Sequence, residues 1–285
     1  MIIHSFAKIN LALYVLNKRK DGYHNIETVF QSISLKDRLV IRKSPDLKVT
    51  CDNPDVPRGP ANLACRAALL VKKAFAVKEN VHIHIEKRIP MAAGLAGGSS
   101  NAAAVVKGLL KFWKIRPDKR KIARILRDLG SDVSFCYAGG TQLGRGRGER
   151  LTPLPPFPKC HVALVNPGVR VSTAWAYRKL KRNLTQSNKL ANLTKGYIDC
   201  LEKRLTLKEF LHNDFEEPVL KAHPVIRRIL ASLEAFRPEA ALMSGSGSSV
   251  FGLFGDKESA LRAVRHFRGL GHFACLSTTL GGTRS

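Results

Sequence analysis

The chain of 285 residues lacks most features that would place it among membrane, secreted or zinc-binding proteins. It contains no apolar run of the roughly 20 residues that a membrane-spanning helix needs. Its six cysteines are scattered, without a C-x-x-C pair, which favours reduced thiols over disulfides or zinc sites. The segment Met1–Lys8 also lacks the basic-then-apolar layout of a signal peptide. We therefore expect a cytoplasmic protein.

Acidic residues are scarce. The chain has 22 Asp and Glu against 48 Lys and Arg, a formal net charge of +26, and the densest basic stretch is Lys107–Arg127. A surface of one sign attracts polyanions, so the charge fits anionic substrates and keeps nucleic-acid binding open as an alternative. The diffuse distribution, and apolar residues at helical spacing through residues 118–129, favour a solvated helix face instead.

The most informative stretch is the glycine-rich segment Pro90–Ala104. It follows an alternating run, Val81–Ile85, that predicts a strand, and it leads into apolar residues at helical spacing, Val105–Trp113. Glycines let backbone N–H groups approach an anion, and the first turn of the helix, with the hydroxyls of Ser99 and Ser100, adds further donors. An ordinary Gly/Ser connection is the alternative, but the strand before and the helix after favour phosphate binding.

Several common phosphate-binding and catalytic motifs are missing. The Walker pattern is absent, because Gly139–Gly144 has the glycine spacing but continues with Arg145 instead of lysine. The dinucleotide pattern G-x-G-x-x-G is not met by the glycine-rich segment, and the H-R-D and D-F-G motifs of protein kinases do not occur. These absences exclude the three commonest phosphate-binding classes.

Two weaker patterns point to other chemistry. The run His82–Glu86 alternates His, His and Glu, which could indicate a metal site, but the P-C-x-x-C partner of zinc deaminases is missing, so ordinary strand side chains are the better interpretation. The residues Ser5–Lys8 spell S-x-x-K, but no K-T-G accompanies them, which argues against acyl transfer.

The glycine-rich segment resembles the central motif of the GHMP small-molecule kinases, since Pro90–Ala102 reads P-x-x-x-G-L-x-x-G-S-S-x-A. Ser244–Phe251 is similar to the third, C-terminal glycine motif of that family. Ala7–Leu11, followed by Asp21–His24, resembles the N-terminal signature of the branch that phosphorylates 4-diphosphocytidyl-2-C-methyl-D-erythritol. Further similar segments are Gly130–Val133, Gly139–Thr141, Arg147–Glu149 and Asn213–Pro218.

The resemblance implies an α+β fold of two lobes, with a ribosomal-protein-like α/β N-terminal lobe, a ferredoxin-like α+β C-terminal lobe and the active site between them. Four prolines in Pro153–Pro158 mark the predicted boundary, giving lobes 1–152 and 159–285. Periodicity and capping signals predict further elements. They are strands at Leu11–Leu16, Ile26–Ile33, His161–Val165, Ala240–Met243 and Val250–Phe254, and helices at Asn62–Val77, between Asp118 and Gly130, at Val225–Leu233 and at Asp256–Phe267.

The resemblance also implies an ATP- and Mg²⁺-dependent transfer of phosphate to the 2-hydroxyl of the substrate, a step of the non-mevalonate isoprenoid route. In this interpretation Asp132 accepts the proton and Lys8 is its electrostatic partner. Ser100 is the magnesium ligand contributed by the protein. The expected ATP-binding residues are Pro90, Met91, Ala92, Ala93, Gly94, Leu95, Ala96, Gly97, Gly98, Ser99 and Ser100.

For the acceptor, the resemblance implies that Tyr23 and Tyr177 enclose the cytosine while His24 bonds its edge. Asn10 is expected beside Lys8, where it binds the erythritol or the phosphate, and Gly245, Ser246 and Gly247 are expected to close the diphosphate side. We expect a monomer or a weak homodimer. Another small-alcohol kinase of the same superfamily is the alternative, and the Asp21–His24 element argues against it.

Two positions depart from the family pattern. Ser134 stands where proline is frequent, and Asn101 stands where many members have aspartate.

Overall fold

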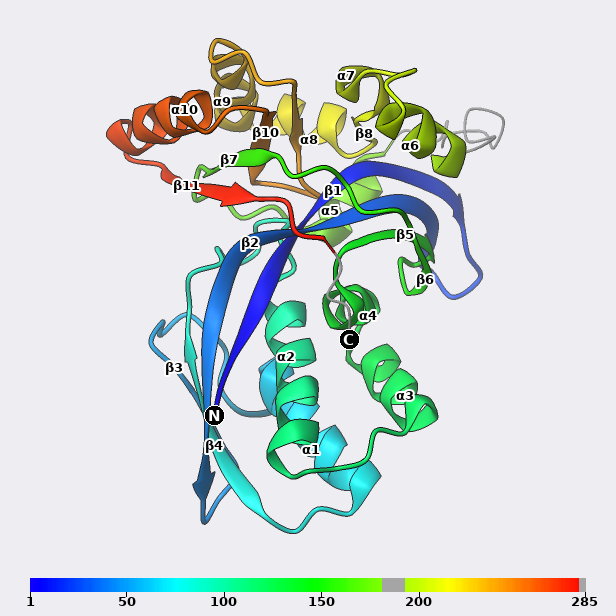
Figure 1. The fold of residues 1–285 in the computed structure, drawn as a ribbon, viewed down its shortest axis with the longest axis vertical. Helices are drawn as coiled ribbons and strands as arrows, with labels where there is room; N and C mark the ends of the chain where they lie inside the picture. Colours follow the sequence, from blue (N-terminus) through cyan, green and yellow to red (C-terminus); the bar gives the residue numbers. More distant parts are fainter. Residues whose placement is uncertain (181–192, 282–285) are drawn as a thin grey trace. The chain divides into compact units, whose positions relative to one another are not determined.

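The computed structural model describes residues 1–180 and 193–281, and its contacts divide the chain into two compact units (Figure 1). Unit 1 comprises Met1–Ala7, Leu35–Met91 and Ala96–Ala138, and unit 2 comprises Lys8–Ser34, Ala92–Leu95 and Gly139–Ser285. The units are discontinuous because two long strands, β1 (Ile2–Lys18) and β2 (His24–Ser44), each contribute residues to both. The proline tract connects β6 (Arg150–Pro153) to β7 (His161–Asn166) inside unit 2, and the division into lobes 1–152 and 159–285 stays a prediction.

Unit 1 combines one part of a seven-stranded sheet with helices. The second half of β2 pairs antiparallel with β4 (Asn80–Glu86), which pairs parallel with β3 (Lys48–Cys51). In Figure 1, α1 and α2 lie side by side against this sheet, and α3 and α4 pack on α2. The apolar residues of β4 are buried in one core with the apolar side of α2, as their spacing predicted. The helical bounds are η1 Gly59–Ala61, α1 Leu63–Phe75, α2 Gly97–Phe112, α3 Lys119–Leu129 and α4 Ser131–Ala138.

Unit 2 contains the first half of β2, which pairs with β5 (Thr141–Gly146) and through it with β6 (Arg150–Pro153), while β1 pairs parallel with β8 (His212–Asn213). A second, antiparallel sheet has the order β11-β7-β10-β9. Helix α10 packs on β7, β10 and β11, and α9 packs on β9 and β10 (Figure 1). The remaining bounds are β7 His161–Asn166, α5 Thr173–Lys179, α6 Leu193–Leu201, α7 Leu207–Phe210, α8 Glu216–Ala222, α9 Pro224–Glu234, β9 Ala240–Met243, β10 Val250–Phe254, α10 Lys257–Gly269 and β11 Phe273–Thr278.

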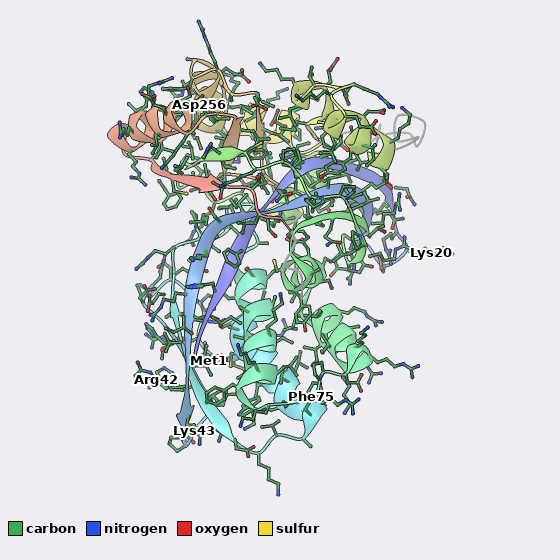
Figure 2. The ribbon with its side chains drawn as sticks, in the orientation of Figure 1. Met1, Lys20, Arg42, Lys43, Phe75 and Asp256 are labelled. Carbon is green, nitrogen blue, oxygen red and sulfur yellow. The ribbon has the colours of Figure 1, made fainter. Side chains whose placement is uncertain are left out.

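The capping signals predicted for α3 are confirmed. The side chains of Asn62, Asp118 and Asp256 each accept a hydrogen bond from the first turn of α1, α3 and α10, and α3 ends at Gly130 as predicted. Figure 2 shows Asp256 at the start of α10. The sequence did not predict α4 or α5, because helices this short carry too few apolar repeats to show helical periodicity.

The basic stretch Lys107–Arg127 is largely a solvated surface, as expected. Helix α3 buries its apolar residues and exposes its basic ones. Exposed cations also project from the β1–β2 turn and from β2, where Figure 2 labels Lys20, Arg42 and Lys43. None of the helices in the described ranges is long and apolar enough to cross a membrane.

We expect Asp118→Ala to lower the melting temperature at pH 7, because the carboxylate accepts the N–H groups of Arg120 (2.9 Å) and Lys121 (3.0 Å) at the start of α3. These hydrogen bonds lower the pKa of Asp118, so its stabilisation is present above the unfolded pKa and is lost as pH falls through the folded pKa. Thermal melts between pH 7 and pH 2 should therefore show the difference from wild type shrinking in acid.

Asp128→Ala is the matched control for this cap. Asp128 is an exposed aspartate at the opposite end of α3, where a negative charge opposes the helix dipole. Its replacement should leave the melting temperature unchanged or slightly higher. Equal losses from both variants would show that Asp118 does not act as the cap.

Candidate active site

The glycine-rich loop has an irregular backbone that presents N–H groups. Ala92, Gly94 and Ala96 have φ values of 50°, 75° and 54°, so alternate residues adopt the left-handed conformation in which neighbouring N–H groups can converge on an anion. Helix α2 begins immediately afterwards, and the N–H of Ser100 is bonded to the carbonyl of Ala96 (2.8 Å). The described residues supply no acceptor for the N–H groups of residues 97–99. This helix terminus therefore has the donors and the positive dipole end that favour a phosphate.

The carbonyl groups of the loop are held by donors in unit 2. The carbonyl of Gly94 accepts from the ammonium of Lys8 (3.0 Å) and from the hydroxyl of Ser244 (3.0 Å). The carbonyl of Leu95 accepts from the backbone N–H of Lys8 (3.2 Å). These bonds fix the middle of the loop to β1 and to the C-terminal glycine segment.

Lys8 is 4% exposed, and a chain of hydrogen bonds orients its ammonium. Lys8 Nζ donates to Asn10 Oδ1 (2.7 Å), Asn10 Nδ2 donates to the hydroxyl of Thr28 (2.8 Å), and Thr28 donates to the carbonyl of Ala12 (2.6 Å). Because the Thr28 hydrogen is directed to Ala12, its oxygen is the acceptor for the Asn10 amide, which turns the Asn10 carbonyl toward Lys8. Asn10 thus lies beside Lys8 as expected and holds it in place.

Thr28 was not predicted from the sequence to be part of the site. The available indication was its hydroxyl group in a predicted strand, because a polar side chain that is buried needs a hydrogen-bond partner.

The C-terminal glycine segment also reaches Lys8. A Cβ added to Gly245, whose φ is 56°, would lie 3.4 Å from Lys8 Nζ. Asn213 Nδ2 donates to the carbonyls of Met243 (2.7 Å) and Gly245 (2.8 Å), and the carboxylate of Glu216 accepts the Met243 N–H (2.9 Å). Burial raises the pKa of Glu216. The motif Asn213–Pro218 therefore acts as the support of this loop.

Ser100 and Asn101, on the first turn of α2, are both engaged within unit 1. The hydroxyl of Ser100 donates to the carbonyl of Phe6 (2.6 Å), which leaves the lone pairs of its oxygen for another donor or a cation. The Asn101 carbonyl oxygen accepts the hydroxyl of Ser5 (2.6 Å), a partner that sequence reasoning did not identify.

The described residues contain no cluster of three His, Cys, Asp or Glu side chains suited to a metal ion. His82 and His84 instead both hydrogen-bond the Thr50 hydroxyl, at 2.7 and 2.9 Å. Both histidines of β4 thus have a hydrogen-bond partner on the neighbouring strand.

Asp132 is the second residue of α4 and is half-buried. It follows Gly130, whose φ of 147° lets the chain turn from α3 into α4. Asp132 belongs to unit 1, whereas Lys8 belongs to unit 2.

The segment Asp21–His24 forms the tight turn between β1 and β2. The Asp21 carboxylate accepts both from the guanidinium of Arg19 and from the Tyr23 N–H (3.2 Å), and Gly22 has a φ of 84°. The bond from Arg19 is the largest cause that lowers the pKa of Asp21. Asp21 and Gly22 thus shape the turn that presents the two aromatic residues.

The structure brings two of the three predicted cytosine-binding residues, His24 and Tyr177, into contact. His24 stacks on Tyr177, with ring centroids 4.9 Å and planes 12° apart, and Phe215 packs edge-on against Tyr177 at 4.8 Å. Tyr23 is 56% exposed, with the guanidinium of Arg147 over its ring at 4.7 Å. Burial, followed by the charge of Lys18, lowers the pKa of His24, so the imidazole is neutral at pH 7 and offers one donor and one acceptor.

Comparison with known proteins gives a consistent result. The chain matches the family model for the GHMP kinases N terminal domain over residues 62–140 and that for GHMP kinases C terminal over residues 180–271. The 4-diphosphocytidyl-2-C-methyl-D-erythritol kinase of Acetivibrio thermocellus is 42% identical over 267 residues, covering 92% of both chains. The same enzyme of Listeria welshimeri is 42% identical over 268 residues, covering 92% of this chain and 90% of the relative.

Solved structures agree with these relatives. A 4-(cytidine 5'-diphospho)-2C-methyl-D-erythritol kinase is 34% identical, with a TM-score of 0.85, and the match covers 99% of this chain and 100% of the other. Homoserine kinase from Cytophaga hutchinsonii, at 17% identity and a TM-score of 0.75 over 99% and 95% of the two chains, shares the fold. The α+β fold with N- and C-terminal domains that the resemblance implied is confirmed.

Two glycine variants separate the roles of the loop. We expect Gly98→Ala to fold normally, because the added Cβ would meet nothing closer than Leu63 Cδ1 at 3.7 Å. The same methyl group should obstruct the approach of a phosphate to the first turn of α2 and raise the Kd for a nucleotide by about tenfold or more. Calorimetric titration with a non-hydrolysable ATP analogue measures this, and a wild-type Kd would exclude this turn from the phosphate site.

Gly94→Ala is the contrasting variant. Its Cβ would lie 2.0 Å from the Ser244 carbonyl oxygen, and its φ of 75° disfavours alanine. We expect a clear loss of melting temperature here but none in Gly98→Ala.

Proposed function

The chain belongs to the GHMP kinase family, and on this basis we propose that it transfers the γ-phosphoryl group of ATP to the 2-hydroxyl of 4-diphosphocytidyl-2-C-methyl-D-erythritol. The kinases of this family use ATP as phosphate donor. Relatives named for this substrate match 92% of the chain. The reaction is a step of the non-mevalonate isoprenoid route.

The observation that carries the proposal is the convergence of both glycine segments on one buried ammonium. Lys8 Nζ bonds the carbonyl of Gly94, and Gly245 lies against the same nitrogen. A fixed cation beside two segments rich in backbone N–H groups is suited to an electron-rich phosphoryl group in transfer. Positioning and charge neutralisation are the main contributions that phosphoryl transfer requires of a protein.

The residues present fit a Mg²⁺ ion only as part of a Mg·ATP complex. The first turn of α2 contains no acidic residue, and Ser100 contributes a hydroxyl oxygen whose hydrogen is already donated to Phe6. We therefore assign Ser100 as the ligand from the protein and expect the phosphates to supply most of the remaining oxygens. When bound, the ion neutralises the developing phosphate charge.

We assign Asp132 as the group that accepts the proton of the substrate hydroxyl. Asp132 lies in the first turn of α4, and a carboxylate within hydrogen-bond reach of the hydroxyl is suited to general-base catalysis. Lys8 is assigned the role of electrostatic partner, a positive charge that favours the ionised form of the alcohol. The buried bond from Lys8 to Asn10 supports this role, because it fixes the position of the charge.

The stacked pair of His24 and Tyr177 is assigned to the cytosine of the substrate. The neutral imidazole can donate to and accept from a base edge, and the exposed ring of Tyr23 offers a surface for stacking. The N–H groups of residues 245–247 are assigned to the diphosphate. An aromatic surface of this kind favours the cytidylyl substrate over the small alcohols phosphorylated by other GHMP kinases, because those alcohols have no base to stack.

The substrate assignment predicts ADP release with 4-diphosphocytidyl-2-C-methyl-D-erythritol and none with homoserine, mevalonate or galactose. A coupled ADP assay on the purified protein with the four acceptors measures this. Turnover of one of the other alcohols instead would identify a different GHMP kinase. A protein inactive on all four that binds RNA would support the nucleic-acid alternative that the net charge of +26 keeps open.

Asp132→Asn should lower kcat by on the order of a hundredfold or more while the KM values change little, because the amide keeps the shape but accepts no proton. Steady-state kinetics at saturating ATP measures this. Asp128→Asn, an exposed aspartate at the end of α3, is the matched control and should keep the wild-type kcat. A near-normal rate for Asp132→Asn would exclude Asp132 as the proton acceptor.

A further inference from the structure

Asp37 is a fully buried carboxylate in β2 that the proposed chemistry does not use. Its Oδ1 accepts the backbone N–H groups of Arg88 (2.6 Å) and Ile89 (2.7 Å), and its Oδ2 accepts from the ammonium of Lys87 (2.9 Å). All three partners belong to the segment that leads directly into the glycine loop at Pro90. Both oxygens of Asp37 are thus directed to the start of that loop.

The ammonium of Lys87 connects this anchor to the far end of the loop. The Lys87 side chain is 5% exposed, and Nζ also donates to the carbonyl of Ile89. A Cβ added to Gly97 would lie 3.0 Å from Lys87 Nζ and 3.1 Å from Ile89 Cγ2. The ion pair and its neighbour Ile89 therefore contact both the residues before the loop and the first residue of α2.

A gain in the free energy of unfolding does not explain why a buried ion pair occupies this position. Removing two charges from water has a cost that a buried pair seldom recovers, and apolar residues of similar volume often serve as well. The pair also holds a cation near the positive end of α2, which is unfavourable unless Asp37 neutralises it. What the pair supplies is geometry, because it fixes the backbone on both sides of a loop whose N–H groups must meet phosphate oxygens within a few tenths of an ångström.

We propose that Asp37 is a positioning residue for nucleotide binding, acting through the backbone of residues 88–89 and, with Lys87, through Gly97. The inference rests on the proposed function only in taking residues 90–100 as the phosphate site. It assigns no contact between Asp37 and the nucleotide.

The test compares two double variants in which Lys87→Met removes the ammonium. In Asp37→Asn with Lys87→Met, the amide oxygen can still accept the N–H groups of Arg88 and Ile89. In Asp37→Ala with Lys87→Met, that acceptor is lost. Because Lys87→Met is common to both, any difference between them is due to the acceptor at position 37. The probe is the Mg²⁺ complex of the non-hydrolysable analogue AMPPNP, titrated by calorimetry.

We expect the alanine double variant to bind AMPPNP about tenfold or more weakly than the asparagine double variant. A change of this size corresponds to the loss of roughly one well-aligned hydrogen bond or more. The KM for ATP should rise in parallel, while kcat at saturating ATP and the KM for the alcohol stay within about threefold of those of the asparagine variant. A purely structural role would instead lower the melting temperature without separating the two KM values. Equal Kd values for the two double variants would overturn the proposal.

Two further variants complete the experiment. Glu86→Gln breaks the neighbouring Arg38–Glu86 pair, which joins β2 to the last residue of β4 and is partly exposed. This variant should leave the Kd unchanged. Asp37→Leu with Lys87→Met replaces the alanine variant if the latter does not melt cooperatively, since leucine restores volume without an acceptor. If neither folds, Asp37 is required for folding and the positioning role is rejected.

The binding of AMPPNP can be measured without the alcohol substrate, so it tests the role of Asp37 independently of the substrate assignment. Wild-type protein that binds AMPPNP but does not phosphorylate the cytidylyl alcohol would refute the assignment and leave the role of Asp37 testable by Kd. The asparagine and alanine variants with equal Kd would refute the role of Asp37 and leave the substrate assignment intact.

Discussion

The buried ammonium of Lys8 is the constraint on which the organisation of the site depends. A cation this far from water is stable only when its hydrogens meet acceptors, and here the acceptors include the side chain of Asn10 and the carbonyl of Gly94. The ring of Phe30, 5.6 Å away, adds a weaker attraction. Gly94 has no room for a side chain, because its Cβ would lie 2.0 Å from the Ser244 carbonyl oxygen, and a Cβ on Gly245 would lie 3.4 Å from Lys8 Nζ. Residues far apart in the sequence are thereby held to one geometry.

The glycine loop is fixed through its carbonyl groups and through the segments that flank it, rather than through its own N–H groups. Lys8 and Ser244 hold the carbonyl of Gly94 in unit 2, while Asp37 holds residues 88–89 in unit 1. The donors of the first turn of α2 are left for a ligand. A binding site prepared in this way loses less entropy on binding, because the protein groups are already ordered before the anion arrives.

The positions of the carboxylates show what the few acidic residues do. Asp37, Asp118 and Asp256 accept backbone N–H groups at loop and helix starts, as Asp21 does in the β1–β2 turn. Glu216 does the same beside the C-terminal glycine segment. Many of the few acids thus serve as backbone anchors, whereas the lysines and arginines of α3 are exposed on the surface. The exposed positive charge favours association with anions and contributes little to the fold.

The sequence by itself determined the local features: the strand, glycine loop and helix from Val81 to Phe112, and the cap at Asp118. These depend on residues close together in the chain, so periodicity and capping chemistry report them directly. The motif order also identified the family, and with it the expected site residues.

Only the tertiary structure decided which buried polar groups meet. Thr28 orients Asn10, Ser5 engages Asn101, and Asp37 holds the start of the loop. Each of these contacts joins segments brought together by strand register and by helix packing. A hydroxyl or carboxylate in a strand pattern shows that a partner is needed but does not show which one, because the partner is set by the pairing of strands far apart in the chain.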